Sequence, residues 1–492
     1  MPEEKEARFV VEWKRIFPWW HIFRSFSIAL DYRKLGLAIV GIVGTWLGWA
    51  LLALILDPGD PGAVPAATAE GGTVSEEWRQ WQRRKYLHDI TQEWLIWPAN
   101  VPRGDTQLPP HRAVAELSPR LATIDYWMAQ VPAILEPLAR LVRPLTYFLD
   151  ERASWQSHIF AALGVLWTLV VWGFVGGALT RIAAVEFARR DRIPLGEAVR
   201  FAGRQFLSLF ATPIFPIAVV AVITVAVWLV GTVLVMIPWV GDMVGALTFP
   251  LALLAGLLMA VLLLVYAGWP IMYPAVSAEA GDAFDAISRS MSYMYQRPWH
   301  YVFYWAVTLV YGILVLFFVV TFTSFFVYLT GWALNLVWRP WWRAGEVDVI
   351  RALFVYAPES YGWRDMLAPG LGSAAQVTEK MALVPRVAAL ILGFWLHLVF
   401  LGMLGFAYSL FWSASTVIYF LLRKAVDETD LDEVYLEEEQ DELFPRPVTP
   451  PDVSLTQVNP PDASVTTVSG TSSAPPTSTE TPPSQESGPA NP

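Results

Sequence analysis

Six long runs of apolar residues dominate the pattern of hydrophobic and polar positions along this chain. None of them contains Asp, Glu, Lys or Arg, and each reaches the roughly 20 residues that a helix needs to cross a bilayer core. One such run could be a buried helix of a soluble protein, but six predict an all-α polytopic membrane protein. The predicted spans are Leu35–Leu56, His158–Thr180, Pro213–Pro238, Met243–Trp269, His300–Thr330 and Ala388–Leu421.

The positions of Lys and Arg predict the orientation, because short basic segments remain in the cytoplasm. Residues 1–34 contain seven basic residues, 181–212 contain six and 270–299 contain two, whereas the turn 239–242 contains none. Both termini are therefore expected in the cytoplasm. The first run begins behind seven basic residues and is too long for a cleaved signal peptide, so we expect a retained anchor.

The two remaining connections, 57–157 and 331–384, are expected outside the membrane. They contain ten and five basic residues, but long external loops are translocated with little regard to charge. Residues 57–72 have the composition of a linker, and the prolines within 117–150 predict short helices. The aromatic residues of these regions include Trp78, Trp81, Tyr86, Trp94, Trp97, Trp332, Trp338, Trp341, Trp342 and Trp363. We expect them to dock on the outer membrane surface; a platform for a lipid, glycan or partner protein is the alternative.

An amphipathic stretch precedes each outward-going span, which predicts three cytoplasmic interfacial helices. Before span five, the predicted polar face carries Asp282, Asp285, Arg289, Ser292 and Gln296, and the apolar face carries Phe284, Ile287, Met291 and Tyr295. Before span three, the apolar face carries Leu195, Ala198, Val199, Ala202 and Phe206, with Glu197, Arg200 and Arg204 opposite. Before span one, Arg24, Ser27, Asp31 and Lys34 are polar, and Ile22, Phe23, Phe26 and Leu30 are apolar.

The segment Ala275–Trp299 contains Asp285 followed by Ala, two further residues, Arg289 and Ser290. It resembles the acid-Ala-x-x-Arg-Ser segment of poorly characterised bacterial six-span membrane proteins, including the membrane domain appended to some glycerophosphodiester phosphodiesterases. The resemblance covers spans two to six and implies a membrane module. It carries over no catalytic residue, because the hydrolase domain of those fused proteins is absent here.

The carboxyl-terminal segment 422–492 has its own composition, with 14 acidic and three basic residues. An acidic part over 427–442 precedes a Pro-, Ser- and Thr-rich part that lacks the apolar residues needed to fold, so we expect a disordered cytoplasmic tail. A short acidic helix that docks a partner is the alternative. The rest of the chain is close to neutral, and no basic field indicates nucleic acid as a partner.

Few residues offer catalytic or metal-binding chemistry. The absence of Cys excludes disulfides and thiolate sites, and the six His have no metal-ligand spacing. Glu279, Asp282 and Asp285 could hold a divalent metal, but we favour a structural role, because Asp282 is placed to cap a helix and Arg289 to neutralise Asp285. His397 lies within a span, where we favour packing or an interhelical hydrogen bond over a proton pathway.

Two further sequence features concern contacts within and between helices. Glu186 is spaced to pair with Arg190 along one helix. Small residues in span one (Gly41, Gly44 and Gly48) and span two (Gly173, Gly176 and Gly177) predict close helix packing within the bundle, with a homo-oligomer face as the alternative.

These observations together predict a multi-pass protein of a bacterial inner (cytoplasmic) membrane, with no cofactor and with membrane lipids around it. We expect a non-catalytic scaffold or envelope-assembly protein that binds partners through the outer loops or the acidic tail. A facilitated transporter of a lipid or amphipathic solute is the alternative, and a membrane enzyme using Glu279, Asp282 and Asp285 is the third.

Overall fold

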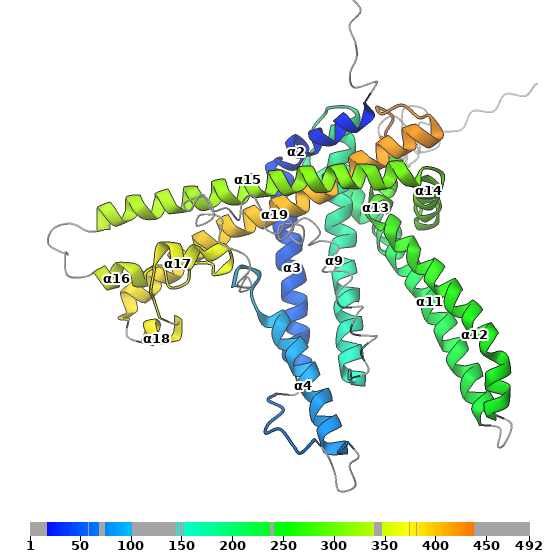
Figure 1. Ribbon diagram of the computed structural model, residues 1–492. Coiled ribbons are helices and arrows are strands. Elements are labelled where there is room, and N and C mark those ends of the chain that lie inside the picture. The colour runs from blue at the N-terminus through cyan, green and yellow to red at the C-terminus, as the bar shows by residue number, and fades with distance from the viewer. Residues whose placement is uncertain are drawn as a thin grey trace, which may run out of the picture. The chain divides into compact units, whose positions relative to one another are not determined.

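The part of the chain that can be described is mainly helical. The computed structural model describes residues 17–57, 59–67, 74–100, 144, 147, 150, 152–236, 241–338, 347–372, 374–379 and 381–436. Helices account for all the regular structure of these residues, and none of them forms a strand (Figure 1). Most of the 117–150 segment, the side chains of Trp338, Trp341 and Trp342, and the tail after residue 436 lie outside the described residues.

Six helices are long and apolar enough to cross a membrane, which confirms the six apolar runs. The fourth continues as a 3-10 turn, η5 (Val265–Gly268), into α13 (Trp269–Glu279), ten residues beyond the predicted end of its span. The other helices also extend past their apolar runs. Their bounds are α3 (Tyr32–Leu56), α9 (Trp155–Ala188), α11 (Phe206–Val235), α12 (Gly241–Leu264), α15 (Pro298–Trp338) and α19 (Leu383–Asp427).

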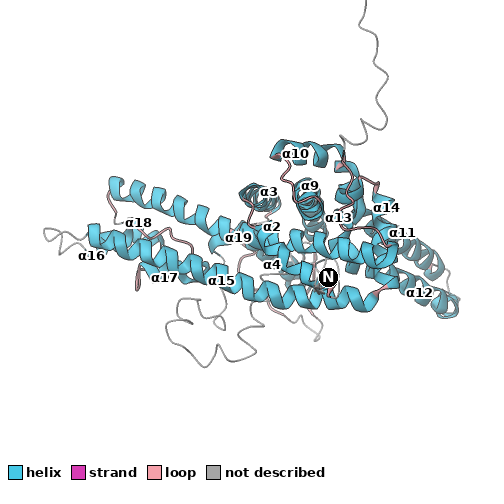
Figure 2. Cartoon of the chain, turned by 90° about the horizontal axis from the view of Figure 1, so that it is seen from above, coloured by secondary structure: helices cyan, strands magenta, loops and turns pink. Residues whose placement is uncertain are grey.

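The helices α15 and α19 run side by side (Figures 1 and 2). They contain 41 and 45 residues, which at about 1.5 Å per residue gives lengths of about 62 and 68 Å. That is about twice the roughly 30 Å of a bilayer core. Each helix therefore has to tilt or to extend beyond the hydrocarbon layer.

Shorter helices connect the long ones. They are η1 (Pro18–Phe23), α2 (Arg24–Ala29), α4 (Glu76–Leu95), η2 (Pro98–Asn100), α10 (Leu195–Arg204), α14 (Ala283–Gln296), α16 (Val347–Ala352), η7 (Ser360–Gly362), α17 (Trp363–Leu367) and α18 (Ala374–Glu379). The helices α10 and α14 lie where the sequence predicts interfacial helices before spans three and five.

The glycines of α3 and α9 lie in packing seams within the chain, as predicted. A Cβ at Gly41 would lie 3.0 Å from the Trp172 ring. Further along the same pair of helices, the Trp167 indole fills the space beside Gly48. These glycines therefore let indole rings pack directly on the backbone of the neighbouring helix.

The carboxyl-terminal half of α19 is buried against several other helices. Tyr408 stacks on Trp172 of α9 with ring centroids 4.7 Å apart, and Trp412 stacks on Tyr273 of α13 at 5.1 Å. Ser409 Oγ donates to the carbonyl of Ala29 at 2.9 Å. By contrast, α11 and α12 pack on each other and expose most of their described apolar side chains, as lipid-facing helices do.

Two of the tryptophans that we expected on the membrane surface are buried in the protein instead. Trp94 of α4 stacks on Trp49 of α3 with centroids 4.0 Å apart. Trp363 is fully buried, packs edge-on against Phe400 and donates its Nε1 proton to Ser324 Oγ at 2.9 Å. The prediction was wrong at these two positions, because α4 and α17 fold back on the long helices and offer the indoles a protein surface.

The predicted faces of the interfacial helices also need correction. In α14 the buried side chains are Ala286, Ser290 and Tyr293, whereas Phe284 and Tyr295 are 69% and 59% exposed. This helix therefore presents two small side chains and the Tyr293 ring to the protein, whereas Phe284 and Tyr295 point outward. In α10, Ala198 and Ala202 are buried as expected, joined by Phe201, whereas Leu195 is exposed.

The amino-terminal stretch differs most from its predicted pattern. It forms η1 and α2 and then breaks at Asp31, which caps α3 by accepting a hydrogen bond from the Arg33 amide at 3.0 Å. The break changes the helical register. Lys34, predicted on the polar face, is fully buried, and Leu30, predicted on the apolar face, is exposed.

Candidate functional site

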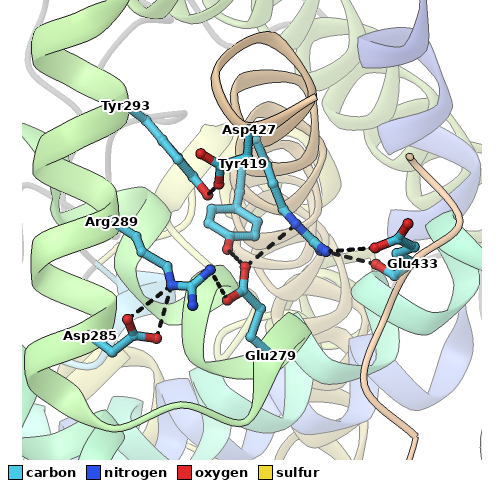
Figure 3. A network of polar contacts seen from close by, with 8 residues as sticks. Glu279, Asp285, Arg289, Tyr293, Tyr419, Asp427 and Glu433 are labelled. Atoms are coloured by element: carbon cyan, nitrogen blue, oxygen red, sulfur yellow. Dashed lines mark hydrogen bonds and ion pairs between the residues drawn. The ribbon is translucent and has the colours of Figure 1, made fainter. Parts of the chain in front are cut away.

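The carboxylate of Glu279 is the centre of a polar cluster between α13, α14 and α19 (Figure 3). We call Glu279, Asp285, Arg289, Tyr419 and Arg423 the junction cluster. It contains three of the four residues that the sequence singles out around Asp282. Tyr419 and Arg423 come from α19, and Tyr419 is 140 positions from Glu279 in the sequence.

Local backbone geometry positions the acidic residues. The helix α13 ends at Glu279, because Ala280 adopts a left-handed conformation with φ of 55°. The chain then reverses through Gly281, and the Asp282 carboxylate caps α14 by accepting from the Asp285 amide at 2.8 Å. The predicted cap is confirmed, and this carboxylate is used by the helix end.

Both oxygens of the Glu279 carboxylate are engaged. Oε2 pairs with Arg289, Oε1 accepts a hydrogen bond from the Tyr419 hydroxyl, and Arg423 Nε lies 3.5 Å from Oε1. The Glu279 side chain is only 14% exposed. Charge-assisted hydrogen bonds of this kind are the strong ones in a partly buried site.

Arg289 joins Glu279 to Asp285. Its Nε donates to both oxygens of the Asp285 carboxylate, at 3.0 and 2.9 Å, which confirms the predicted i,i+4 pair. Burial alone would lower the pKa of Arg289, but the hydrogen bonds to Asp285 and the charge of Glu279 outweigh it and raise the pKa. The guanidinium is therefore a permanent positive charge between two carboxylates.

Arg423 continues the network into the residues that follow α19. Its Nη1 donates to the Glu433 carbonyl at 3.0 Å, and Nη2 lies 3.6 Å from the Glu433 carboxylate. The Tyr435 amide donates to the Ala278 carbonyl at 2.8 Å. Residues 428–435 thus fold back over the end of α13, and the acidic part of the tail begins with an ordered stretch.

A second phenol lies beside the cluster. Tyr293 of α14 donates its hydroxyl proton to Asp427, the last residue of α19. Burial raises the pKa of Tyr293, and the neighbouring Asp427 carboxylate raises it further. The phenol stays neutral and acts as a hydrogen-bond donor between the two helices.

These contacts indicate a structural role, in which ion pairs hold α13, α14 and α19 together, rather than metal binding. The oxygens of Glu279 and Asp285 face guanidinium groups, and Asp282 caps its helix. Over the described residues, no group of three or more His, Asp or Glu side chains is placed to hold a metal ion. The charged groups of this site therefore form ion pairs between helices.

His397 lies apart from the junction cluster. Its Nδ1 donates to the Gly393 carbonyl of its own helix at 2.8 Å, and its ring packs near Trp97. This hydrogen bond lies within one helix rather than between helices, and the role in packing stays a prediction. The ring also lines a cavity of about 330 Å³, together with Asn100, Val355, Tyr356, Ala357, Glu359, Ala374, Leu390, Gly393 and Phe394.

A second set of buried charges, at the start of α3 and the end of α9, was not predicted from the sequence. Lys34 Nζ donates to Ser413 Oγ of α19, and its charge interacts with Glu186 of α9. The predicted pair of Glu186 with Arg190 fails, because α9 ends at Ala188 and Arg190 has a left-handed φ of 61°.

Arg181 is another buried charge that was not predicted. It is buried, donates to the Ser277 carbonyl at 2.9 Å and lies over the Phe201 ring. Span boundaries drawn at the first charged residue treated Arg181, Glu186 and Arg423 as loop residues. The helical spacing of Tyr419 and Arg423 was a signal that the last helix continues.

The comparisons with known proteins add no relative: no family model, no curated protein and no solved structure matches this chain.

Proposed function

We propose that this chain is a multi-pass scaffold or envelope-assembly protein of a bacterial cytoplasmic membrane, with both termini in the cytoplasm. The observation that supports this proposal is that the acidic side chains of the junction cluster are paired with basic ones. The acids that could support catalysis are paired with Arg289 and Arg423, so they join helices to one another. The six apolar helices supply the membrane anchorage.

The orientation is supported by where the structure gathers charge. The amino-terminal segment, the α9–α10 connection, α14 and the end of α19 all carry basic residues. Contacts such as Arg33 with Ile193 and Arg289 with Glu279 bring basic residues to the same ends of neighbouring helices. Basic segments at one end of a helical bundle are typical of the cytoplasmic side.

A scaffold needs a partner, and purification of the full chain in mild detergent tests this. We expect one protein to co-purify in a fixed ratio and to remain bound through a high-salt wash. Reconstitution into liposomes is the matching negative assay, because a scaffold should give no solute or lipid flux. Purification of the chain alone, together with flux in liposomes, would contradict the proposal.

A facilitated transporter of a lipid or amphipathic solute is the second candidate, favoured by the cavity beside His397. Its lining combines aromatic and aliphatic side chains with an amide, a carboxylate and an imidazole, a mixture that suits an amphipathic molecule. A substrate-dependent rise in thermal stability that is lost in Phe394→Ala would favour this candidate over the scaffold.

The enzyme alternative receives less support, because it requires acids that are free to react. Two variants of α14 separate it from the scaffold. Asp285→Asn weakens a pair in which both side chains are 40% exposed, and such a pair contributes about 0.3–0.5 kcal/mol. Ile287→Asp places a charge on a half-buried side of the helix. We expect Ile287→Asp to reduce abundance more; normal abundance with lost function in Asp285→Asn would favour the enzyme.

A further inference from the structure

Two segments far apart in the sequence meet beside the end of α9. The Arg24 guanidinium of α2 lies 4.9 Å from the centroid of the Phe187 ring, and the His21 ring packs edge-on against the same ring. Arg33 Nη1 donates to the Ile193 carbonyl at 2.5 Å. The amino-terminal basic segment is thus held against the basic α9–α10 connection.

The contact brings like charges together. Arg24 is half-buried; burial lowers its pKa, and repulsion from Arg190 lowers it further, with Glu186 acting in the opposite direction. Arg190 and Arg192 are exposed, and Arg190 has a left-handed backbone, which non-glycine residues rarely adopt. We call Arg24, Arg190 and Arg192 the basic patch.

The acidic residues of this region offset only part of its positive charge. Asp31 accepts hydrogen bonds from Arg33 Nε and Nη2, at 3.1 and 2.7 Å. Glu186 interacts with Arg24, Arg192 and the buried Lys34, and Asp191 stands between Arg190 and Arg192 in the sequence. Across 24–34 and 186–192 there are six basic residues and three acidic ones. A net positive charge therefore remains where α3 begins and α9 ends.

Exposed apolar side chains flank Arg24 along the chain. Trp20, Leu30 and Tyr32 are all at least about half exposed, Tyr32 being 77% exposed. Aromatic rings next to basic side chains, at the ends of membrane-spanning helices, are typical of the layer where lipid headgroups meet water. This setting favours a lipid ligand over an anion dissolved in water.

We infer that the basic patch binds the phosphate of an anionic phospholipid headgroup. A phosphate between Arg24 and Arg190 removes their mutual repulsion, and guanidinium groups match phosphate oxygens through paired hydrogen bonds. Basic clusters adjoining spanning helices on the cytoplasmic side recognise anionic lipids in this way. The inference rests on the cytoplasmic orientation proposed above.

The test uses the full chain purified in detergent and titrated with phosphatidylglycerol, with phosphatidylcholine as the uncharged reference. We expect a rise in the midpoint of thermal unfolding with phosphatidylglycerol alone. Arg190→Gln and Arg192→Gln should each weaken the apparent affinity about fivefold, as expected for one basic residue near a lipid surface. Arg200→Gln, an exposed residue of α10, is the matched control and should leave the affinity unchanged.

Three outcomes would overturn the inference. One is an equal effect of phosphatidylcholine, and another is unchanged affinity in both patch variants. The third is the same stabilisation by inorganic phosphate at equal concentration, which would show a site for a soluble anion. Because the titration is done in detergent, it does not depend on orientation. Lipid binding together with external labelling of the α10 region would retain the site and refute the proposed orientation.

Discussion

The indole of Trp167 occupies the space that a side chain at residue 48 would need, and its Nε1 donates to the Gly44 carbonyl at 2.9 Å. The relationship is reciprocal further along the helix pair, where the Trp49 ring fills the space beside Gly164. Each helix therefore contributes an indole and receives one. A glycine and a tryptophan at matching heights fix how α3 and α9 are aligned along their axes.

The first prediction follows from this alignment. Gly48→Ala should destabilise the protein by about 1–3 kcal/mol, the usual range for overpacking, because the added methyl group collides with Trp167. The measurement is the midpoint of thermal unfolding in detergent. Gly36→Ala is the matched control on the same helix, since nothing lies within 4 Å of its Cβ position. Equal midpoints for the two variants would contradict the packing role.

The second prediction concerns Arg423. Its side chain is 11% exposed and lies between Glu279 and Glu433, so Arg423→Met leaves a carboxylate partly buried without this partner. Removing one member of a buried ion pair costs about 3–5 kcal/mol, and we expect the lower end here because Arg289 still pairs with Glu279. Lys424→Met is the control, because Lys424 is 49% exposed. If both variants unfold at the same temperature, the cluster does not join the helices.

The third prediction is a pH dependence. Asp57 ends α3 and accepts hydrogen bonds from His88 and Gln92 of α4, both at 2.9 Å. Burial raises the pKa of Asp57, but these hydrogen bonds and the one from the Gly59 amide outweigh it and lower the pKa. A lowered pKa contributes stability above the unfolded value of about 3.9, which is lost as the pH falls through the folded value.

Asp57→Asn should therefore lower the unfolding midpoint at pH 5, and its difference from the wild type should shrink at pH 3. Thermal unfolding of both proteins in detergent at the two pH values measures this. Asp60→Asn serves as the control, because Asp60 accepts only from the Gly62 amide among the contacts described. A difference of the same size at pH 5 and pH 3 would assign the effect to packing rather than to charge.

The fourth prediction tests the orientation. The chain has no Cys, so single cysteines can be labelled on a clean background. We expect Ala67→Cys to react with an impermeant reagent from outside intact cells, and Gly196→Cys of α10 to react only after the membrane is opened. Both variants should accumulate normally, since both positions are exposed and nothing lies within 4 Å of a Cβ at Gly196. External labelling of Gly196→Cys would reverse the topology.

Much of the fold could be predicted from the apolar runs, because length and the absence of charge alone identify a helix that can cross a membrane. The cap at Asp282 and the pair of Asp285 with Arg289 could be predicted too, since both depend on residues three or four apart. The glycine seams of α3 and α9 were predictable because small residues have few other reasons to recur on one helix face.

The rest of the site depends on contacts between distant segments. The pairing of Glu279 with Arg423, and the hydrogen bond from Lys34 to Ser413, join residues more than a hundred positions apart. Helical periodicity carries no signal for such partners. The apolar pattern also wrongly predicted that Phe284 is buried. An outward-facing residue of a membrane protein can be as apolar as a buried one.

The dependence on α19 has a consequence for biogenesis. Domains assemble in the order of synthesis, amino terminus first, so α3 and α9 can pair while the later helices are still being made. Lys34 and Glu279 must wait for Ser413, Tyr419 and Arg423, which are made after the other five membrane-spanning helices. Until then Lys34 lacks the Ser413 hydroxyl, and Glu279 is held by Arg289 alone among these partners. A product that stops before α19 therefore exposes polar groups that the full bundle buries or pairs.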